Sequence, residues 1–391
     1  MRTGIFGGSF DPVHAEHVRL AESAVKSLRL DRLLVMPAHT PPHKRDKVLS
    51  SDADRLAMCR IAFRDVPGAE VSDYEITRGG TSYTYLTCRH FKAEDPDGEL
   101  FWLVGTDMLR DFPTWREPED ILQNATLAVC ARAEKKGWAE AEEKAFAARF
   151  QKPFAVIPYE GKEVSSTRIR VLAAAGEDVS PYTGKEVAAY LAGKGLYRIP
   201  NAEKALSLEK PSRRAHSIRV AFLAAERAKP LGVDEKRAVT AALFHDCAKN
   251  LPPDSPYLSG FLPPPDVPGP VLHQYAGAYV AEKLGVTDEE VLDAIRYHTS
   301  GRREMTALGK LVFLADLLEE GRTYDGVDRL RALFAKGKEG LDECMEESLK
   351  DTLAYLGEKG GEIYPLTREA YEYYKAENLK KKEKNYGGNH E

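Results

Sequence analysis

The first half of the chain alternates short apolar runs with amphipathic stretches. Five runs are rich in β-branched or aromatic residues and bounded by glycine or proline, which predicts buried strands at Thr3–Phe6, Leu33–Met36, Phe101–Val104, Leu127–Cys130 and Phe154–Ile157. The stretches between them, such as His14–Leu28 and Asp52–Phe63, carry apolar residues at helical spacing. This alternation indicates βαβ units in a parallel sheet, with ligands at the carboxyl ends of the strands.

The pattern changes near residue 200, beyond which the spacing of apolar positions predicts only helices. These helices are Arg213–Ala228, Asp234–Cys247, Val271–Leu284, Asp288–Tyr297, Met305–Glu319 and Leu341–Leu356. The segment Leu251–Pro270 holds eight prolines and is predicted to be a long loop. We therefore expect an α/β domain over residues 1–200, an all-α domain over 205–375 and a polar tail over 376–391.

Composition narrows the class of protein. A chain of 391 residues with 43% hydrophobic and 30% charged residues is typical of two soluble globular domains. The mean hydropathy of -0.43 and the lack of a long apolar run argue against a membrane partner. A net charge of -5 gives no electrostatic case for nucleic acid as a partner. Five cysteines without a CxxC pair, and no visible secretory signal, predict reduced thiols in a cytoplasmic protein.

The first predicted strand runs into Gly7-Gly8-Ser9-Phe10-Asp11-Pro12-Val13-His14, and the helix that follows carries His17. Glycines let the backbone approach a phosphate closely, and a helix N-terminus offers unpaired N–H groups to an anion. Two histidines three residues apart point the same way and can stabilise charge on a phosphorus under attack. The motif therefore favours a phosphate site, although a Gly-Gly turn alone is often needed only for backbone geometry.

This stretch resembles the His-x-Gly-His signature of the nucleotidylyltransferase superfamily, and further segments narrow the resemblance to bacterial nicotinate-nucleotide adenylyltransferases. In chain order they correspond to that family's basic phosphate loop, its pyridine-nucleotide pocket and its late Ser-Ser-Thr-x-Ile-Arg motif: Pro37–Lys44, Ser82–Thr87, Val104–Trp115 and Val164–Arg170. The resemblance covers residues 1–197. It implies a Rossmann-like fold that transfers AMP from ATP, accompanied by Mg²⁺, to nicotinate mononucleotide.

The resemblance also implies roles for single residues. His14 and His17 would stabilise the triphosphate and the transition state, and Lys44 and Arg170 would bind the ATP phosphates. Gly105 and Asp107 would line the nucleotide, and Thr84 and Trp115 would hold the nicotinate end. The remaining expected substrate-binding residues are Gly7, Gly8, Ser9, Phe10, Ser166 and Thr167, of which the last two are also good helix N-caps.

One position departs from the pattern of this family, because Glu16 stands where a glycine is expected between the two histidines. A carboxylate there would either repel the triphosphate or turn outward as an acid favoured by the helix dipole. Repulsion predicts that Glu16→Gly lowers the KM for ATP. The presence of Glu16 also leaves open a different class of function, in which the first domain is a nucleotide-binding regulatory module with weak or no transferase activity.

Histidines and aspartates recur along the second half in an order suited to metal ions. They are His216, His245, Asp246, His273, His298 and Asp316. Imidazole with carboxylate suits iron, manganese, cobalt or zinc better than calcium, and a bridging Asp246 would allow two ions. A single His-Asp pair is more often structural, whereas the ordered set favours a metal site.

This order resembles the HD-domain metal-dependent phosphohydrolases, and in detail their YqeK-like branch. The matching segments are Arg214–Ser217, Leu243–Lys249, His298–Gly301 and Ala315–Arg322. The resemblance covers residues 208–375 and implies symmetrical hydrolysis of diadenosine tetraphosphate to two ADP at a centre that favours iron. Lys249 and Arg322 would then meet substrate phosphates, or would merely cap helix ends.

The sequence thus predicts a bifunctional enzyme whose small-molecule partners are ATP, nicotinate mononucleotide and diadenosine tetraphosphate. The open alternative for the second domain is another phosphoester, such as a nucleotide monophosphate or a cyclic dinucleotide. A homo-oligomer is compatible with the sequence, which does not determine the oligomeric state.

Overall fold

The computed structural model describes residues 1–42, 49–131, 138–159, 161, 162 and 164–387, and it divides the chain into two compact units. The first unit comprises residues 1–169 and 178–196, and the second comprises residues 170–177 and those from 197 onward. Residues 170–177, which the sequence analysis placed in the first domain, therefore belong to the second unit.

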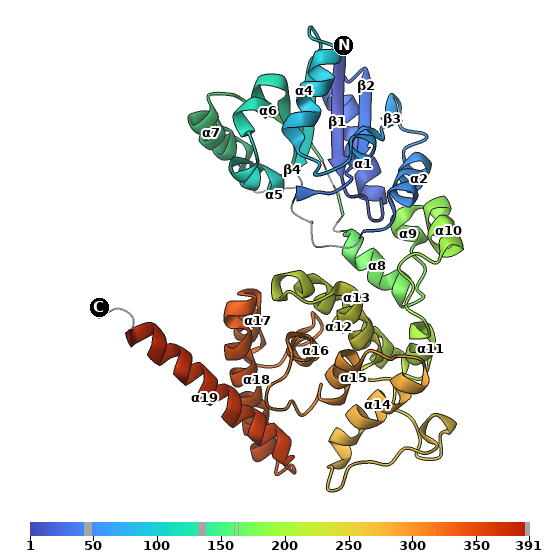
Figure 1. The fold of residues 1–391 in the computed structure, drawn as a ribbon, viewed down its shortest axis with the longest axis vertical. Coiled ribbons are helices and arrows are strands. Elements are labelled where there is room, and N and C mark those ends of the chain that lie inside the picture. Colours follow the sequence, from blue (N-terminus) through green and yellow to red (C-terminus); the bar gives the residue numbers. More distant parts are fainter. Residues whose placement is uncertain (43–48, 132–137, 160, 163, 388–391) are drawn as a thin grey trace. The chain divides into compact units, whose positions relative to one another are not determined.

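A six-stranded parallel sheet forms the centre of the first unit (Figure 1). Its strands are β1 (Arg2–Gly8), β2 (Arg32–Pro37), β3 (Ala69–Val71), β4 (Glu99–Gly105), β5 (Thr126–Ala131) and β6 (Ala155–Pro158). They lie in the order β3-β2-β1-β4-β5-β6, so the topology reverses between β1 and β4. All five predicted strands are confirmed, and β3, with only three residues, was not predicted.

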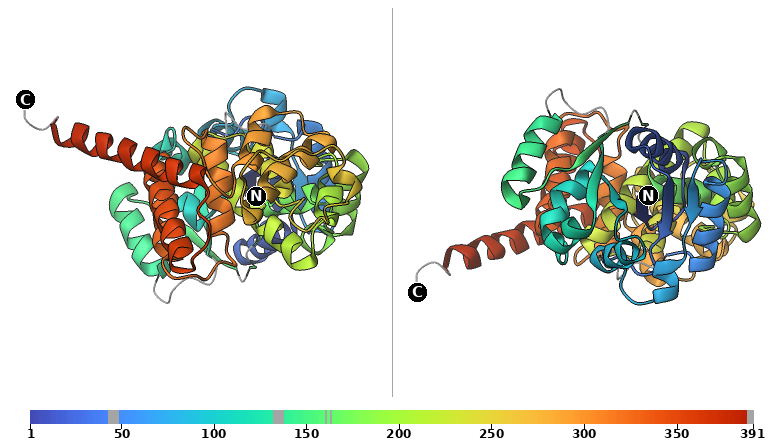
Figure 2. Two further views of the ribbon diagram at one scale, coloured as in Figure 1. Left: turned by 90° about the horizontal axis from the view of Figure 1, so that it is seen from below. Right: turned by 90° about the horizontal axis from the view of Figure 1, so that it is seen from above.

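Helices cover both faces of this sheet (Figures 1 and 2). The helices of the first half of the chain are α1 (Ala15–Leu28), α2 (Asp52–Ala62), α3 (Tyr74–Arg78), α4 (Thr84–Glu94), α5 (Thr106–Asp111), η2 (Phe112–Thr114), α6 (Pro118–Asn124), α7 (Trp138–Phe150), α8 (Ser166–Ala174), α9 (Ser180–Thr183) and α10 (Lys185–Lys194), and the end of α8 belongs to the second unit. Alternate strand residues such as Ile5, Trp102 and Leu127 share one buried cluster with Ile121 of α6, as the period of two in a strand requires. The Rossmann-like architecture expected from the sequence is confirmed.

The described part of the second unit is entirely helical. Its helices are α11 (Ala202–Ser207), α12 (Pro211–Leu231), α13 (Glu235–Phe244), α14 (Leu272–Lys283), α15 (Glu289–Arg296), α16 (Ala307–Leu318), α17 (Val327–Ala335), α18 (Lys338–Glu358) and α19 (Pro365–Gly387). The six predicted helices are present within a few residues of their expected ends, whereas α11, α17 and α19 were not predicted. Residues 376–387 of the expected polar tail continue α19, which extends beyond the other helices of its unit (Figure 2).

Helix α16 lies at the centre of the second unit. The predicted apolar stripe Met305, Leu308, Val312 and Ala315 is at most 5% exposed, and Phe313 beside it is equally buried. The helix packs against α12, α15 and α18. Its burial on nearly all sides places the carboxylate near its end inside the unit rather than on a solvated face.

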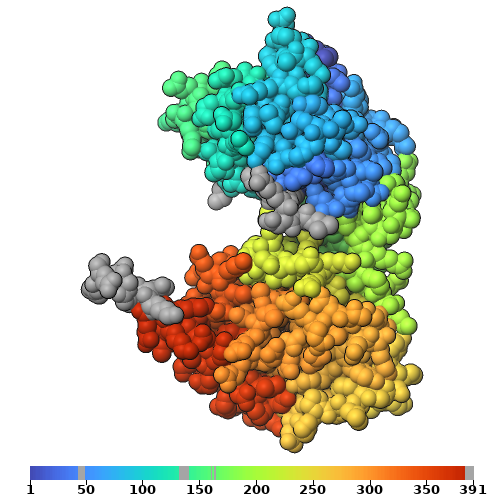
Figure 3. Space-filling model, in the orientation of Figure 1, coloured from blue at the N-terminus to red at the C-terminus, as the bar shows by residue number. Residues whose placement is uncertain are grey.

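The segment 251–270 has no α-helix, as its prolines predict. It contains only the short turns η3 (Pro256–Leu258) and η4 (Gly269–Val271), and Leu262 within it is 87% exposed. Figure 3 shows gold-coloured residues of this part of the chain on the outside of the second unit. The segment is a surface loop.

Composition predicted reduced thiols and argued against a membrane partner, and the structure describes the cysteines and the helix lengths that these two expectations concern. All five cysteines are buried and free of disulfides. Within the described residues, every helix is too short or too polar to cross a bilayer.

Candidate active sites

The turn after β1 brings two histidines to the start of α1. His14 is the N-cap, and its backbone N–H donates to Nδ1 of His17 over 3.1 Å. The two rings are stacked, with centroids 3.6 Å apart. Because Nδ1 of His17 accepts this bond, a neutral His17 carries its proton on Nε2. The turn therefore holds one imidazole as a fixed N–H donor beside the other.

The glycines at the ends of β1 and β4 have different surroundings. A Cβ at Gly7 would lie 2.9 Å from the ring of Trp102, and one at Gly8 would lie 3.0 Å from the ring of Phe10, so a side chain at either position would crowd these rings. A Cβ at Gly105 would meet no described atom within 4 Å. Since β1 and β4 are neighbours at the reversal of strand order, the open space beside Gly105 lies where this fold binds ligands.

Phe10, expected among the substrate-binding residues, has a core side chain. It is 2% exposed and packs against Phe6 and Phe63, with ring centroids 5.3 and 6.0 Å away. Only its backbone is available to a ligand at this turn. The preceding Ser9 is fixed through its carbonyl oxygen, which accepts a bond of 3.0 Å from the buried guanidinium of Arg55.

The loop after β2 and the residues before α4 are joined by hydrogen bonds. The N–H of His39 donates to Oγ of Ser82, and the N–H of Ser82 donates to the carbonyl of Thr40, both over 3.0 Å. Thr84 then begins α4 with its side chain partly exposed. Two of the motifs separated in the sequence are therefore adjacent. Lys44 lies outside the described residues.

Trp115 follows η2 and packs against Phe112, with ring centroids 5.3 Å apart. Its indole Nε1 is buried and has no hydrogen-bond partner in the part of the chain that the structure describes. An unsatisfied buried donor is costly, so this atom marks a candidate contact to a ligand. Asp107, in the first turn of α5, is exposed.

Helix α8 begins beside the β1–α1 turn. Its N-cap is Ser165, whose Oγ accepts the N–H of Arg168 over 3.2 Å, and not Ser166 or Thr167 as expected. Ser166 instead donates through Oγ to the carbonyl of Pro12 over 2.9 Å. This bond fixes the start of α8 against the turn that carries the histidines.

Arg170, expected to bind ATP phosphates, is buried in α8 and belongs to the second unit. Its guanidinium pairs with Glu235 of the same unit at 2.6 Å. The structure therefore gives this side chain a protein carboxylate as its partner.

Glu16 does not turn outward, since its side chain is buried in the first turn of α1. Its Oε2 accepts the hydroxyl of Tyr159 and, over 2.9 Å, the backbone N–H of Lys162. Its Oε1 accepts Nη1 of Arg19 over 2.6 Å. Both oxygens of this carboxylate are thus engaged inside the protein.

In the second unit, the six expected metal ligands lie together. His216 is on α12, His245 and Asp246 directly follow α13, His273 is on α14, His298 follows α15, and Asp316 is on α16. Their ligand atoms form three overlapping groups, each within 4.8 Å: His216, His245 and Asp246; His245, His298 and Asp316; and Asp246, His273 and His298. Six residues from five parts of the sequence thus meet at one buried cluster.

Each imidazole of the cluster is oriented by a bond at Nδ1. In His245, His273 and His298 this atom lies 2.7 to 2.8 Å from the carbonyl oxygen of the residue three positions earlier. In His216 it lies 3.0 Å from Oε1 of Glu319, which is itself buried. A ring that donates through Nδ1 presents the lone pair of Nε2 to its other side. The four Nε2 atoms are therefore directed at the aspartates.

This donor set fits divalent metal ions. The Nε2 atoms of His273 and His298 lie 3.2 Å apart, and in the neutral tautomer that donates through Nδ1 neither ring carries a proton on Nε2. Nε2 of His245 is buried without a hydrogen-bond partner among the described residues. Burial lowers the pKa of His245 to about 4 and that of His273 to about 3, so both are neutral at pH 7. Imidazole nitrogens whose lone pairs converge in this way are ligands that transition metals prefer.

Cationic side chains surround the two aspartates. Nζ of Lys249 lies 3.2 Å from both oxygens of Asp246, and Nη2 of Arg322 lies 2.7 Å from Oδ1 of Asp316. Arg213, which sequence reasoning missed, places Nη1 2.9 Å from Oδ2 of Asp246. Burial alone would raise the pKa of Asp246, but the imidazoles and Lys249 hold it well below its usual range. Both carboxylates are thus charged and ready to bind a cation.

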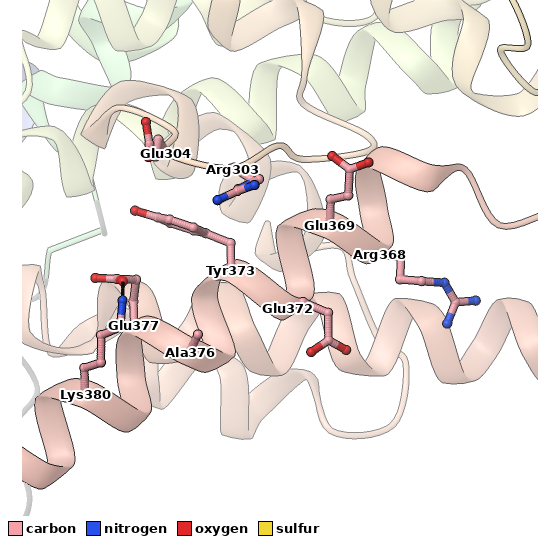
Figure 4. Close-up of a pocket in the computed structure, with 9 residues that line it drawn as sticks. All are labelled: Arg303, Glu304, Arg368, Glu369, Glu372, Tyr373, Ala376, Glu377 and Lys380. Carbon is pink, nitrogen blue, oxygen red and sulfur yellow. Dashed lines mark hydrogen bonds and ion pairs between the residues drawn. The ribbon is translucent and has the colours of Figure 1, made fainter.

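A separate groove of about 640 Å³ lies on the second unit between α19 and the residues before α16 (Figure 4). Its lining mixes both signs of charge and contains none of the expected site residues: Arg303, Glu304, Arg368, Glu369, Glu372, Tyr373, Ala376, Glu377 and Lys380. The guanidinium of Arg303 lies over the ring of Tyr373. This mixed lining indicates no particular ligand.

Comparisons with known proteins match both halves. Residues 5–172 match the Cytidylyltransferase-like family and residues 213–321 match the HD domain family. Over 354 residues the chain is 32% identical to the "Probable nicotinate-nucleotide adenylyltransferase/Ap4A hydrolase" of Mycoplasma genitalium, covering 88% of this chain and 96% of that protein. The protein of the same name from Mycoplasma pneumoniae is 30% identical over 361 residues, covering 88% and 97%. The chain belongs to the nicotinate-nucleotide adenylyltransferase/Ap4A hydrolase family.

In this adenylyltransferase/hydrolase chain, the two matched regions contain nearly all of the candidate site residues. The HD match includes the six clustered ligands, Lys249 and Arg213, and it ends one residue before Arg322. The second half is also 31% identical to a solved structure from Clostridium acetobutylicum, described as a "predicted HD superfamily hydrolase involved in NAD metabolism", with a TM-score of 0.40 and coverage of 45% of this chain and 97% of that one.

Two features of this adenylyltransferase/hydrolase could not be found from its sequence motifs. Glu319 orients His216, but the adjacent Glu320 is an equally plausible candidate in the sequence. Arg213 contacts Asp246, whereas the adjacent Arg214 pairs with Glu177. In both cases the local backbone, a helix for the arginines and the end of α16 for the glutamates, selects the functional neighbour, and not residue type.

Proposed function

We propose that this chain catalyses both reactions that its family name describes. Residues 1–200 transfer AMP from ATP to nicotinate mononucleotide, giving nicotinate adenine dinucleotide and pyrophosphate. Residues 205–375 hydrolyse diadenosine tetraphosphate symmetrically to two ADP. The reactions take place in the cytoplasm, and the polyphosphates of both substrates bind to the cationic and N–H donors described above.

In the transferase, the phosphate of nicotinate mononucleotide attacks the α-phosphorus of ATP, and the bond from that phosphorus to the β-phosphate oxygen breaks. His17 donates through Nε2 to the phosphates, since its Nδ1 is held by the backbone of His14. The start of α8, with Ser166 and Thr167, supplies N–H groups to the same anion, and Lys44 adds positive charge. Mg²⁺ bound with ATP offsets charge on the leaving pyrophosphate. No covalent intermediate with the enzyme is needed.

The nicotinate end of the substrate lies beside Trp115 and Thr84, and the nucleotide lies beside Gly105 and Asp107. Trp115 supports this assignment because its buried Nε1 is an unsatisfied donor within the described residues. Gly105 supports it because open space adjoins its Cα. Gly105 is the last residue of β4, and Trp115 lies in the segment that follows this strand.

In the hydrolase, water attacks the β-phosphorus and the bond to the central bridging oxygen breaks, which leaves ADP on each side. His216, His245, His273, His298, Asp246 and Asp316 hold two divalent ions, for which we propose iron, with manganese, cobalt or zinc as substitutes. Bound ions supply a hydroxide at neutral pH and polarise the phosphoryl oxygens. Lys249, Arg322 and Arg213 contact the polyphosphate, and their positive charge stabilises the charge that develops on it.

The observation that carries this proposal is the convergence of four Nε2 atoms, each fixed by a bond at Nδ1, on two buried aspartates. A structural cluster of histidines would share protons among its rings, whereas in His245, His273 and His298 the bond from Nδ1 to a backbone carbonyl favours the tautomer with an unprotonated Nε2. The cluster thus favours a metal-dependent hydrolase over a regulatory or purely structural helical domain.

The test is to strip the full chain of metal and to resupply single ions. Mg²⁺ alone is expected to restore the formation of nicotinate adenine dinucleotide, whereas two ADP per diadenosine tetraphosphate are expected only after a transition metal returns. Bound metal is quantified in parallel. Absence of the dinucleotide product in every condition would reject the transferase. Hydrolysis that is equally fast in the stripped chain would reject the metal-dependent hydrolase.

A further inference from the structure

The carboxylate of Glu16 is buried beside the candidate phosphate site of the first unit, and both of its oxygens have hydrogen-bond partners. It is 3% exposed and lies between His14 and His17 in the sequence. Within hydrogen-bond distance of its two oxygens are the hydroxyl of Tyr159, the N–H of Lys162 and Nη1 of Arg19. The same hydroxyl of Tyr159 also lies 3.2 Å from the carbonyl oxygen of Glu16.

These partners give the side chain a definite place in the fold. Tyr159 directly follows β6, and Lys162 lies between β6 and α8, more than 140 residues from Glu16 along the chain. The carboxylate therefore ties the first turn of α1 to the segment that leads into α8. A second tie joins the same two regions, since Ser166 donates to the carbonyl of Pro12.

Charge compensation removes the objection that a carboxylate at this position would repel ATP. Arg19, one turn along α1, donates to Oε1 over 2.6 Å, and the other oxygen accepts two further donors. A buried carboxylate that accepts several hydrogen bonds is stabilised in place, and the neighbouring guanidinium of Arg19 offsets its charge. The side chain has the contacts of a structural tie, not those of a group facing a substrate.

We infer that Glu16 is a positioning residue of the adenylyltransferase, which holds the start of α8 in register with the histidines of α1. The inference rests on the proposed transferase function. Both regions must contact one triphosphate, and catalysis falls steeply when reacting groups are displaced, by about a hundredfold for about 1 Å. Loss of the tie is therefore expected to reduce turnover, which is the opposite of what charge repulsion by Glu16 predicts.

The test compares Glu16→Gly, Glu16→Gln and Tyr159→Phe in the full chain. Glu16→Gly is expected to lower kcat about tenfold and to raise the KM for ATP, while the KM for nicotinate mononucleotide changes less than about twofold. Tyr159→Phe removes a single hydroxyl and is expected to lower kcat severalfold. Glu16→Gln keeps one oxygen that can accept from Tyr159 and Lys162, loses the bond to Arg19, and is expected to rescue most of the turnover.

The double variant Glu16→Gly with Tyr159→Phe tests whether the two residues affect turnover through their shared contact or independently of each other. Because both residues act through one contact, the double variant is expected to be no slower than Glu16→Gly alone. The matched control is Glu22→Gly, which places the same substitution at an exposed position of the same helix and is expected to leave kcat unchanged. Hydrolysis of diadenosine tetraphosphate by each variant shows that the second domain is folded.

Two outcomes would overturn these assignments, and they are distinguishable. An active wild type whose Glu16→Gly variant has equal or higher kcat and a lower KM for ATP would reject the positioning role and restore charge repulsion. A wild-type chain that forms no nicotinate adenine dinucleotide would reject the transferase function itself, and the positioning role with it.

Discussion

The Nε2 atoms of His273 and His298 face each other at 3.2 Å, and both lie within 3.5 Å of the same oxygen, Oδ1 of Asp246. Each ring is held by a backbone carbonyl on its far side, so neither can turn away without losing a hydrogen bond, which for His298 is buried. Asp246 is therefore the group on which this part of the cluster depends, and it is the first residue to test.

Asp246→Ala is expected to abolish bound metal and polyphosphate hydrolysis while leaving adenylyl transfer nearly unchanged. The substitution removes both oxygens that face the imidazoles, and it leaves Lys249 and Arg213 without their shared carboxylate. His245→Ala is expected to behave alike, and the two losses should be strongly non-additive because neither residue builds the site alone. Metal content and the two activities are measured on the same preparation.

The control for this experiment is Asp254→Ala, which removes an exposed carboxylate from the loop between α13 and α14. It should retain both metal and hydrolysis. Full metal content and hydrolysis in Asp246→Ala would make His245-Asp246 an ordinary structural pair and would remove the basis for the hydrolase.

Glu319→Gln is expected to weaken metal binding by about tenfold or more without altering any metal ligand. The carboxylate accepts from Nδ1 of His216 and is fixed in turn by Arg219 at 2.6 Å. An amide can present its nitrogen to the ring. This disfavours the tautomer that donates through Nδ1 and leaves Nε2 without a proton on the side of Asp316. The measurement is metal release to a competing chelator, with Glu320→Gln, an exposed neighbour, as the control. Equal release by both variants would contradict a role for Glu319 in orienting the ligand.

Arg213→Ala is expected to raise the KM for diadenosine tetraphosphate roughly tenfold, which corresponds to one lost charge-assisted hydrogen bond. Metal content should persist, because Arg213 contacts Asp246 but offers no lone pair to an ion. Arg214→Ala is the matched control, since the neighbouring guanidinium pairs with Glu177 instead. Loss of metal with an unchanged KM would show that Arg213 serves Asp246 and not the substrate.

Glu209 is expected to make the stability of the second domain fall as pH rises. Its side chain is buried, its oxygens accept the hydroxyl of Ser217 at 2.9 and 3.1 Å, and burial raises the pKa of this carboxyl to about 8. Between its ordinary pKa of 4.5 and about 8, the folded state binds more protons than the unfolded state, so the free energy of unfolding decreases with increasing pH. One pKa unit corresponds to about 1.4 kcal/mol, so even a third of this shift implies a loss of about 1.5 kcal/mol.

Chemical unfolding of the full chain at pH 5.5 and pH 8, at fixed metal content, tests this expectation. Glu209→Gln should flatten the dependence on pH, because the amide does not ionise. Glu282→Gln, at an exposed position of α14, should keep the slope of the wild type. An equal slope in all three proteins would show that another group causes the dependence.

The elements and ligands that the sequence predicts well are those with local signals. The strand at Leu33–Met36 is an uninterrupted apolar run, and the helix over Met305–Glu319 carries apolar residues at helical spacing. Both elements are present. His245 and Asp246 are rare residue types in a recognisable order, and the structure brings them together with the other ligands. By contrast, β3 is three residues long and holds a glutamate, so its pattern is too short to detect.

Contacts that depend on distant partners could not be predicted. The orientation of Glu16 is decided by Tyr159, which lies 143 residues away, and nothing in the first turn of α1 reveals it. Likewise, Ser165 caps α8 although Ser166 is the same residue type. The hydroxyl of Ser166 donates instead to the carbonyl of Pro12. Residue type limits the candidates, and tertiary packing selects among them.

The burial of all five cysteines makes the native chain suitable for site-specific labelling. Burial raises the pKa of every thiol, to about 12 for Cys130 and Cys344 and higher for Cys59, Cys88 and Cys247. Since the thiolate is the form that reacts, alkylating dyes should leave the folded wild type unmodified. A cysteine introduced at Glu22 and another at Asp254, both exposed, would then be the reactive positions. Fluorescence transfer between them would report the separation of the two catalytic domains during turnover.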